Sequence, residues 1–212
     1  MARGRLNSII GNLDNLPLCV DLDGTLIHSD LLLESTALLL RNQPWMVLAL
    51  PFWVLQGRAA VKRRIAERVS LAADSLPYNQ EVLQFLREEK AKGRVLVLAT
   101  AAEKHLAVLV ADHLAVFDLV LASDGVHNLK GTKKLDALHA RYGPDFCYAG
   151  DSSADLPIWR VCREAILVNP SRRTLRHATA CARIVRVFES PRHTTRLILH
   201  LLRILTGSVS IC

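Results

Sequence analysis

Two aspartates with a chemically useful spacing, Asp21 and Asp23, lie at the end of the short apolar run 18–22, in the sequence Asp-Leu-Asp-Gly-Thr. At the end of a strand, one carboxylate can attack a phosphorus atom while the other, on the adjoining turn, gives a proton to the leaving oxygen. Several carboxylates repel a dianionic phosphate, so a site of this kind needs a cation. The spacing therefore predicts metal-dependent phosphoryl transfer.

Further along the chain, Asp151 and Asp155 in the sequence Gly-Asp-Ser-Ser-Ala-Asp supply more hard oxygen ligands, which suit Mg²⁺ better than a soft metal. Thr100 follows an apolar run of its own and offers a hydroxyl and a backbone N–H to phosphate oxygens. Lys130 precedes a predicted helix and can place an ammonium group against the phosphate and the nucleophile. These residues complete a candidate phosphate site.

Each residue alone has a reading without function. Asp23 could close an Asx turn, Thr100 could cap a helix, and Lys130 could be a solvated lysine with Lys133 and Lys134 as rivals for its role. The order of the motifs is more specific than any one of them: a strand and DxDGT, a strand and Thr, a Lys before a helix, a strand and GDxxxD. We therefore interpret the set as one site.

The elements that must position these residues follow from the apolar pattern. We predict strands over 18–22, 94–99, 118–122, 146–149 and 165–168, and helices over 58–69, 79–92, 103–114 and 133–142. Strands that alternate with helices are typical of parallel βαβ units and of a three-layer α/β sandwich. The carboxyl edge of such a sheet would gather Asp21, Thr100 and Asp151, where open α/β sheets bind ligands.

Residues 23–93 separate the first two strands, far more than one crossover helix needs. This surplus predicts an inserted helical cap. We expect a core formed by 1–28 and 93–189, a helical cap insertion over 29–92, and a basic amphipathic C-terminal helix over 190–212.

Four segments resemble the motifs of the haloacid dehalogenase (HAD) superfamily over residues 16–170: Asp-Leu-Asp-Gly-Thr-Leu at 21–26, Leu-Ala-Thr at 98–100, Lys130, and Gly-Asp-Ser-Ser-Ala-Asp at 150–155. The resemblance implies a Rossmannoid parallel sheet and an aspartyl-phosphate intermediate on Asp21. It implies that Asp23 is the general acid and then the base, and that Thr100 and Lys130 bind the phosphoryl group.

The same resemblance implies that Mg²⁺ is held by Asp21, the backbone carbonyl of Asp23 and Asp151, with Asp155 in a supporting position. Lys130 is preferred among the lysines because its distance from Asp151 along the chain resembles that in phosphoserine-phosphatase-like members. The long insert resembles their C1-type cap. Asp23 favours a phosphatase, since the dehalogenases of the superfamily lack an aspartate there.

A narrower resemblance links four segments (17–27, 75–79, 123–131 and 149–152) to the HAD domain fused ahead of UbiA-type membrane prenyltransferases. It implies a membrane prenyltransferase as partner and a polyprenyl-linked sugar phosphate as one class of substrate. In those fusions the transferase follows the HAD domain, whereas this sequence stops at residue 212. We therefore expect a stand-alone or truncated phosphatase that works beside a separate transferase.

Composition points to an anionic partner. The formal net charge is +7, the isoelectric point is about 9.5 and the mean hydropathy is +0.21. A phosphorylated substrate or an anionic membrane surface fits this charge. Nucleic acid is unlikely, because aromatic residues make up 5% and form no stacking platform within the basic runs. Five scattered cysteines, with no signal peptide and no run long enough to span a membrane, predict a cytoplasmic location.

Two apolar segments account for the high hydropathy. Residues 45–55 are followed at once by Arg58, Lys62, Arg63 and Arg64, so this segment either lies in an anionic membrane interface or packs on its neighbours in the cap, the interpretation we favour. The tail 190–212 carries a narrow basic stripe on an apolar helix. We expect it to bind a membrane, a partner or the body of the domain, and we favour the inner face of a membrane together with a partner. The arginines between 172 and 186 are interpreted as a solvated or lipid-facing helix.

The sequence thus predicts a Mg²⁺-dependent phosphomonoester hydrolase acting on a phosphorylated small molecule or a polyprenyl-linked sugar phosphate. One alternative is a non-catalytic HAD-like module that docks or regulates a membrane prenyltransferase. Another is a different reaction of the superfamily, such as a phosphomutase.

Overall fold

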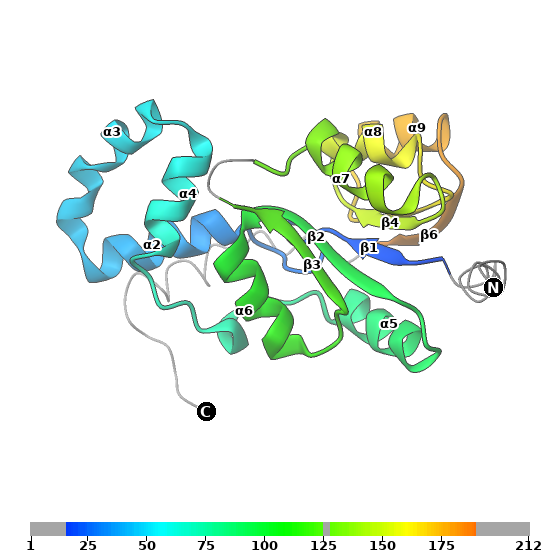
Figure 1. Ribbon diagram of the computed structural model, residues 1–212, viewed down its shortest axis with the longest axis horizontal. Coiled ribbons are helices and arrows are strands. Elements are labelled where there is room, and N and C mark those ends of the chain that lie inside the picture. The colour runs from blue at the N-terminus through cyan, green and yellow to red at the C-terminus, as the bar shows by residue number, and fades with distance from the viewer. Residues whose placement is uncertain (1–15, 125–127, 190–212) are drawn as a thin grey trace, which may run out of the picture.

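The computed structural model describes residues 16–124 and 128–189, and its framework is a six-stranded parallel sheet (Figure 1). The strands are β1 Leu18–Val20, β2 Leu96–Glu103, β3 Leu119–Ser123, β4 Cys147–Gly150, β5 Glu164–Val168 and β6 Ile184–Phe188. Their order is β3-β2-β1-β4-β5-β6, so β2 and β4 flank β1. The chain leaves β1 for one side of the sheet and later returns to the other side, which places the ligand-binding crevice at the carboxyl end of β1.

Helices cover both faces of the sheet, which confirms the predicted three-layer α/β class. One face carries α5 (Gln80–Ala91) and α6 (Lys104–Leu114), and the other carries α7 (Thr132–Tyr142), α8 (Leu156–Trp159) and α9 (Arg172–Thr179) (Figure 1). Short 3₁₀ turns occur at η2 (Ala73–Ser75) and η3 (Ser153–Asp155). Side chains alternate along a strand, so Leu18 and Val20 enter one core while Cys19 enters the other.

The insertion between β1 and β2 is helical and has a small core of its own. It contains α2 (Leu31–Asn42), η1 (Pro44–Leu48), α3 (Leu50–Leu55) and α4 (Arg58–Ala66), which lie beside the sheet at one end of the molecule (Figure 1). Leu39, Trp53, Ile65 and Val69 form the buried cluster among these helices. Helix α5 was expected within the cap, but its apolar face packs on the sheet, so we place it with the core layer.

Most of the apolar segment 45–55 is exposed, which contradicts our expectation that it packs on its neighbours. Trp53 is buried, but Trp45, Leu48, Phe52 and Leu55 are 62%, 82%, 61% and 85% exposed. The segment forms two short helical pieces, η1 and α3, each with a proline near its start. A short helix can turn only one narrow face toward α2 and α4, so the remaining apolar side chains face outward.

The sixth strand, β6, was not predicted. It lies in the basic stretch that we interpreted as a helix, of which only α9 is helical. The guanidinium of Arg186 lies 4.6 Å from the ring centroid of Phe85 and 4.5 Å from that of Phe188. Stacking on two rings allows a charged residue to occupy an edge strand, because its stem and planar head cover apolar surface.

The predicted C-terminal helix over 190–212 lies outside the described residues. Within the part of the chain that the structure describes, no helix has both the length and the apolar character needed to cross a bilayer.

The packing of α5 on the sheet can be tested by replacing Leu86, whose side chain is fully buried. We expect Leu86→Ala to lower the free energy of unfolding by about 2–5 kcal/mol, because the lost contacts leave a cavity. Leu48→Ala is the matched control and should change it by less than about 0.5 kcal/mol. Urea unfolding followed by circular dichroism measures both, and equal effects of the two variants would contradict this packing.

Candidate active site

Asp21 leaves β1 at the carboxyl edge of the sheet with its carboxylate fixed. Its backbone N–H donates to the carbonyl of Ala149 over 3.0 Å, which continues the pairing of β1 with β4 by one residue. Oδ1 of Asp21 accepts from the N–H of Leu22 at 2.8 Å, and Oδ2 lies 2.9 Å from Nζ of Lys134. The side chain is 14% exposed, so it can meet a ligand while most of it is buried.

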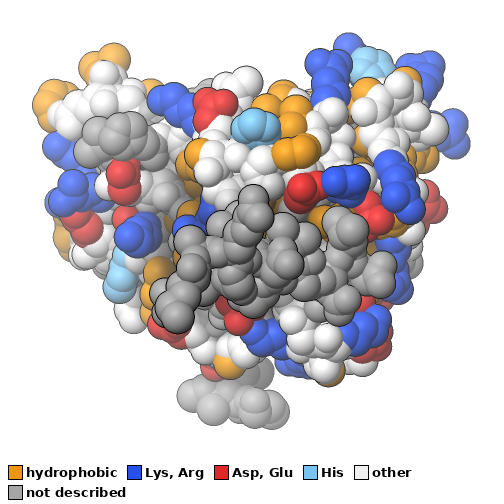
Figure 2. Space-filling view, turned by 45° about the vertical axis from the view of Figure 1, so that its right-hand side comes forward, with side chains coloured by type: hydrophobic (Ala, Val, Ile, Leu, Met, Phe, Trp, Pro, Cys, Tyr) orange, Lys and Arg blue, Asp and Glu red, His pale blue; other side chains and the backbone are white. Residues whose placement is uncertain are grey.

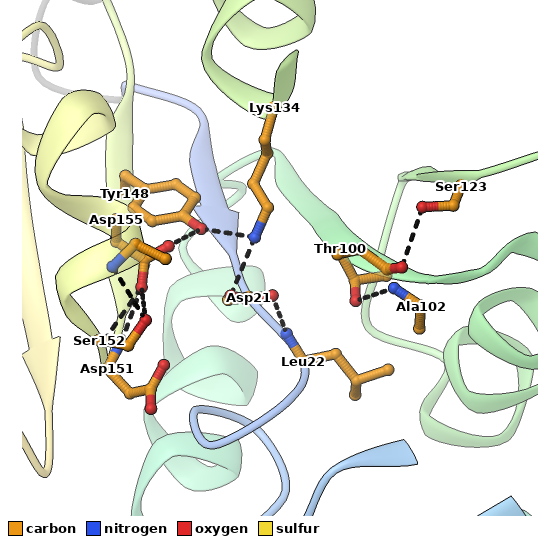
Figure 3. A network of polar contacts seen from close by, with 12 residues as sticks. Asp21, Leu22, Thr100, Ala102, Ser123, Lys134, Tyr148, Asp151, Ser152 and Asp155 are labelled. Carbon is orange, nitrogen blue, oxygen red and sulfur yellow. Dashed lines mark hydrogen bonds and ion pairs between the residues drawn. The ribbon is translucent and has the colours of Figure 1, made fainter. Parts of the chain in front are cut away.

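A chain of polar contacts runs from Asp21 through Lys134 and Tyr148 to Asp155 (Figure 3). Nζ of Lys134 donates to the hydroxyl of Tyr148 at 2.9 Å, and that hydroxyl donates to Oδ1 of Asp155 at 2.9 Å. Lys134 is 4% exposed, so its charge is balanced within this network rather than by water. The network ties α7, β4 and η3 to the carboxyl end of β1.

The lysine that contacts Asp21 is Lys134 and not Lys130, which the sequence analysis preferred. Lys130 precedes α7 and is exposed, although its side chain lines the same cavity. Lys134 lies in the first turn of α7, four residues before the buried Leu138, so the face that packs on the sheet also carries this ammonium group. A lysine in register with a buried leucine was the sequence signal for this contact.

The loop after β4 is held by Asp155. Oδ2 of Asp155 accepts from the N–H of Asp151 at 3.3 Å, from the N–H of Ser152 at 3.1 Å and from Oγ of Ser152 at 3.3 Å. Asp151 then faces Gly24, where a Cβ would lie 2.4 Å from Oδ2 of Asp151. Gly24 also has a φ of +74°, so both space and backbone conformation favour glycine there.

Three carboxylates converge where the resemblance implied a metal ion. Asp21, Asp151 and Asp155 each offer an oxygen, and these atoms lie within 4.8 Å of one another. Such a set of hard oxygen donors fits Mg²⁺. Both carboxylate oxygens of Asp155 accept hydrogen bonds within the protein. Asp21 and Asp151 are therefore the better metal ligands, and Asp155 holds the loop that carries Asp151.

Burial and mutual repulsion favour protonation of the carboxyl groups in this site. The pKa of Asp23 is raised to about 7, first by burial and then by the nearby Asp30, against a hydrogen bond from the N–H of Leu31. Burial and the charges of Asp155 and Asp21 raise the pKa of Asp151 to about 7 as well. Burial also raises the pKa of Asp21, which Lys134 opposes. A proton on Asp23 near neutral pH is what a general acid requires.

Thr100 lies inside β2 rather than after it, because the strand continues to Glu103. Its side chain is fully buried, and its hydroxyl accepts from the N–H of Ala102 at 3.0 Å. In the view of Figure 3, Thr100 lies on the other side of Asp21 from Asp151. The next residue, Ala101, lines the cavity beside Asp21. The strand thus brings Ala101 to the site, while the Thr100 hydroxyl accepts a hydrogen bond from the backbone.

A cavity of about 410 Å³ lies over these residues, and the insertion contributes part of its wall. From α4, Lys62 reaches across the cavity and donates to the carbonyl of Ala101 at 2.6 Å. Burial lowers the pKa of Lys62, while the charges of Asp23 and Asp30 oppose this shift. The sequence analysis placed Lys62 only in a basic surface cluster, since nothing in the sequence pattern places α4 against β2.

Comparison with known proteins places the chain in a family. The model of the haloacid dehalogenase-like hydrolase family matches residues 18–160. A protein of Sinorhizobium fredii (strain NBRC 101917 / NGR234), the uncharacterized protein y4nM, is 41% identical over 154 residues. That match includes 72% of this chain and 30% of the relative, so the chain spans less than a third of the relative's length.

Solved structures share the fold at low sequence identity. A protein of unknown function from Bordetella pertussis Tohama I aligns with a TM-score of 0.62 and 15% identity, over 80% of this chain and 97% of that one. A substrate-bound phosphoserine phosphatase aligns with a TM-score of 0.59 and 14% identity, over 89% of this chain and 98% of that one. A predicted phosphatase from Clostridium acetobutylicum aligns with a TM-score of 0.59 and 16% identity, over 87% of this chain and 98% of that one. These likenesses establish the fold.

The crowding of carboxylates predicts a pH-dependent stability in the absence of metal. The pKa of Asp151 rises from 3.8 to about 7 on folding, so the folded protein holds this proton more tightly than the unfolded chain. The stabilisation is complete below pH 4 and is lost as the pH rises through 7. We expect the Tm in EDTA to fall between pH 5 and 8, and Asp151→Asn to raise the Tm at pH 8 by about 2–4 °C for each kcal/mol relieved.

Differential scanning fluorimetry measures this change, with Asp112→Asn, at an exposed position of α6, as the control that should change nothing. An Asp151→Asn variant that is less stable than the wild type at pH 8 in EDTA, with an unchanged pH slope, would refute the repulsion.

Proposed function

The chain belongs to the haloacid dehalogenase-like hydrolase family, and from this premise we propose that it hydrolyses phosphomonoesters with Asp21 as the nucleophile. The observation that carries the proposal is the Asp21 carboxylate, held 2.9 Å from Lys134 and beside Asp151 at the carboxyl end of β1. A carboxylate that is partly exposed, charge-balanced and fixed by a backbone N–H is positioned for attack on phosphorus.

The reaction would proceed in two displacements. Asp21 attacks the phosphorus atom, the ester P–O bond breaks, and Asp23 gives its proton to the departing alkoxide, which leaves an aspartyl phosphate and an alcohol. Asp23, now a carboxylate, takes a proton from a water molecule that attacks the same phosphorus. Inorganic phosphate leaves and Asp21 is restored. The raised pKa of Asp23, about 7, suits a group that gives and then accepts a proton near neutral pH.

Charge balance assigns the remaining residues. Asp21, the backbone carbonyl of Asp23 and Asp151 would hold Mg²⁺, which when bound neutralises the charge of the carboxylates and of the phosphate. Lys134 takes the part that we first gave to Lys130, while Lys130 stays at the cavity wall as a second cation for the phosphate. Thr100 would contribute through the part of β2 that carries Ala101 to the cavity.

Activity on p-nitrophenyl phosphate in the presence of Mg²⁺ tests the proposal. We expect turnover by the wild type and none above the buffer blank for Asp21→Asn, because an amide cannot form the aspartyl phosphate. Turnover by the wild type that does not exceed that of the Asp21→Asn variant would leave the non-catalytic, transferase-regulating alternative as the better account.

Two lysine variants serve as a matched pair in the same assay. Lys134→Met should lower kcat by about 10²–10³, the usual cost of losing a group that stabilises developing charge. Lys130→Met should cost much less, since Lys130 is exposed and makes no contact with Asp21 among the described ion pairs.

We also propose that helices α2–α4 act as a cap of the C1 type over the core site. Lys62, which links α4 to the end of β2, supports this role. We propose a phosphorylated small molecule or a polyprenyl-linked sugar phosphate as the substrate. If the substrate is polyprenyl-linked, a membrane prenyltransferase is the expected partner.

We also propose a peripheral contact with an anionic membrane, which the exposed end of this insertion supports. Among the described residues, six of the ten exposed large hydrophobic side chains lie in η1 and α3. In Figure 2, hydrophobic side chains gather at the upper left, the end of the molecule at which Figure 1 places α3. Arg64 of α4 and Arg68, which follows this helix, lie beside this surface, each with its guanidinium over the ring of Trp53. Apolar side chains next to cations suit an anionic interface.

Vesicle flotation tests this contact. The full chain should float with vesicles of phosphatidylglycerol and phosphatidylcholine and much less with phosphatidylcholine alone. Replacement of Trp45, Leu48, Phe52 and Leu55 by serine should lower the partition coefficient at least about tenfold, because their apolar area no longer inserts.

The double replacement Val185→Ser and Val187→Ser, on the exposed edge strand β6, is the control and should float like the wild type. A chain without residues 190–212 reports the contribution of the tail. Equal recovery of the wild type and the four-residue variant would exclude η1 and α3 as the contact.

A further inference from the structure

A second cavity, of about 300 Å³, adjoins the one over the aspartates. Asp30, Lys62 and Lys130 line both cavities, so the two share a wall. Away from this shared wall, the second cavity is bounded by Leu32 of α2, by Val54 and Val61, and by the polar Asn128. Each cavity falls in or near the size range of small-molecule sites, about 300–1,000 Å³.

The two cavities differ in chemistry. Asp21, Asp23 and Asp151 surround the first, which suits a metal ion and a phosphoryl group. The three aliphatic side chains of the second offer no charge and no hydrogen bond. They come from α2, α3 and α4, so three helices of the insertion converge on one apolar wall. The cations Lys62 and Lys130 lie where the two cavities meet. The ester oxygen of a phosphomonoester that occupies both cavities would lie at this point.

Val54 is 62% exposed, although it faces this cavity. Because this side chain is not covered by the protein, its apolar surface is available to a ligand that enters the cavity. The apolar surface also continues outward from the cavity, since Leu55 follows Val54 and is 85% exposed. The second cavity therefore lies between the phosphate site and α3, which carries part of the apolar end of the insertion.

We propose that the second cavity is the subsite for the alcohol portion of the substrate and that this portion is a hydrocarbon chain. The substrate class is then an amphiphilic phosphomonoester, with its phosphate over Asp21 and its chain along Leu32, Val54 and Val61. This inference rests on the proposed phosphatase function, and it adds a specificity that the aspartates do not determine.

A series of n-alkyl phosphates, from ethyl to octyl, tests the subsite in the presence of Mg²⁺ and below the concentration at which the longer members form micelles. We expect kcat/KM, measured by phosphate release, to rise about two- to fourfold with each added methylene until the chain outgrows the cavity. The upper value corresponds to full burial of a methylene, about 0.8 kcal/mol.

Val54→Asp should reduce the increase of kcat/KM with chain length, because a carboxylate at the wall of the second cavity disfavours an apolar chain. The readout is the ratio of kcat/KM for octyl phosphate to that for ethyl phosphate, which a general loss of folded enzyme leaves unchanged. Val185→Asp, at an exposed valine of β6 remote from the insertion, is the matched control and should keep the wild-type ratio.

The outcomes separate this inference from the proposed function. Turnover with a flat chain-length series in the wild type, or an unchanged ratio in Val54→Asp, would overturn the subsite and leave the phosphatase in place. Hydrolysis of p-nitrophenyl phosphate but of no member of the series would likewise overturn the subsite. If p-nitrophenyl phosphate is not hydrolysed either, the phosphatase proposal fails, and isothermal titration with ethyl- and octylphosphonate decides the subsite. Tighter binding of the octyl compound, lost in Val54→Asp, would support it, and equal dissociation constants would overturn it.

Discussion

The repulsion among carboxylates at the end of β1 is the constraint that the rest of the site must satisfy. Asp21, Asp151 and Asp155 bring oxygens within 4.8 Å of one another, and the half-buried Asp23 lines the same cavity. Like charges in a partly buried site oppose ionisation, yet the carboxylate that we propose as the nucleophile must be ionised. Lys134 compensates Asp21, and the hydrogen bonds on Asp155 compensate that group. The negative charge of Asp151 is the least compensated of the three, so the site favours the binding of a cation.

The fold meets this constraint by bringing elements distant in sequence to one edge of the sheet. The parallel register of β1 with β4 brings Asp21 to the loop that carries Asp151, and α7 packs on the same sheet so that its first turn presents Lys134. Tyr148, within β4, connects that lysine to Asp155. Gly24 allows the loop after β1 to approach Asp151 without a Cβ in the way. A backbone shift in any of these elements would change the charge balance of Asp21.

Sequence alone predicted the sheet, its two helical layers and the four aspartates, because each of those features is local. A buried parallel strand is a run of apolar residues, and an aspartate at its end falls on the carboxyl edge whatever the rest of the chain does. The lysine was harder to predict. Lys130 lies before α7, whereas Lys133 and Lys134 differ only in the face of this helix on which they fall, and that face is set by how Leu138 packs on the sheet. The strand β6 was missed for a similar reason, since Arg186 resembles a solvated residue until Phe85 and Phe188 are seen beneath it.

The insertion follows a different physical logic from the core. Its buried cluster is small, and a link such as that from Lys62 to Ala101 joins it to the sheet, while much of η1 and α3 is apolar and exposed. A segment of this kind gains little from folding against itself, because the surface that would stabilise it stays in water. The same surface becomes favourable when a hydrocarbon chain or a lipid interface covers it. The core therefore supplies the charge that phosphorus chemistry needs, and the insertion supplies apolar area whose burial depends on what the protein binds. Specificity for an amphiphilic phosphate requires a charged site and an apolar surface next to each other. Lys62 lies between the two, where the cavities meet.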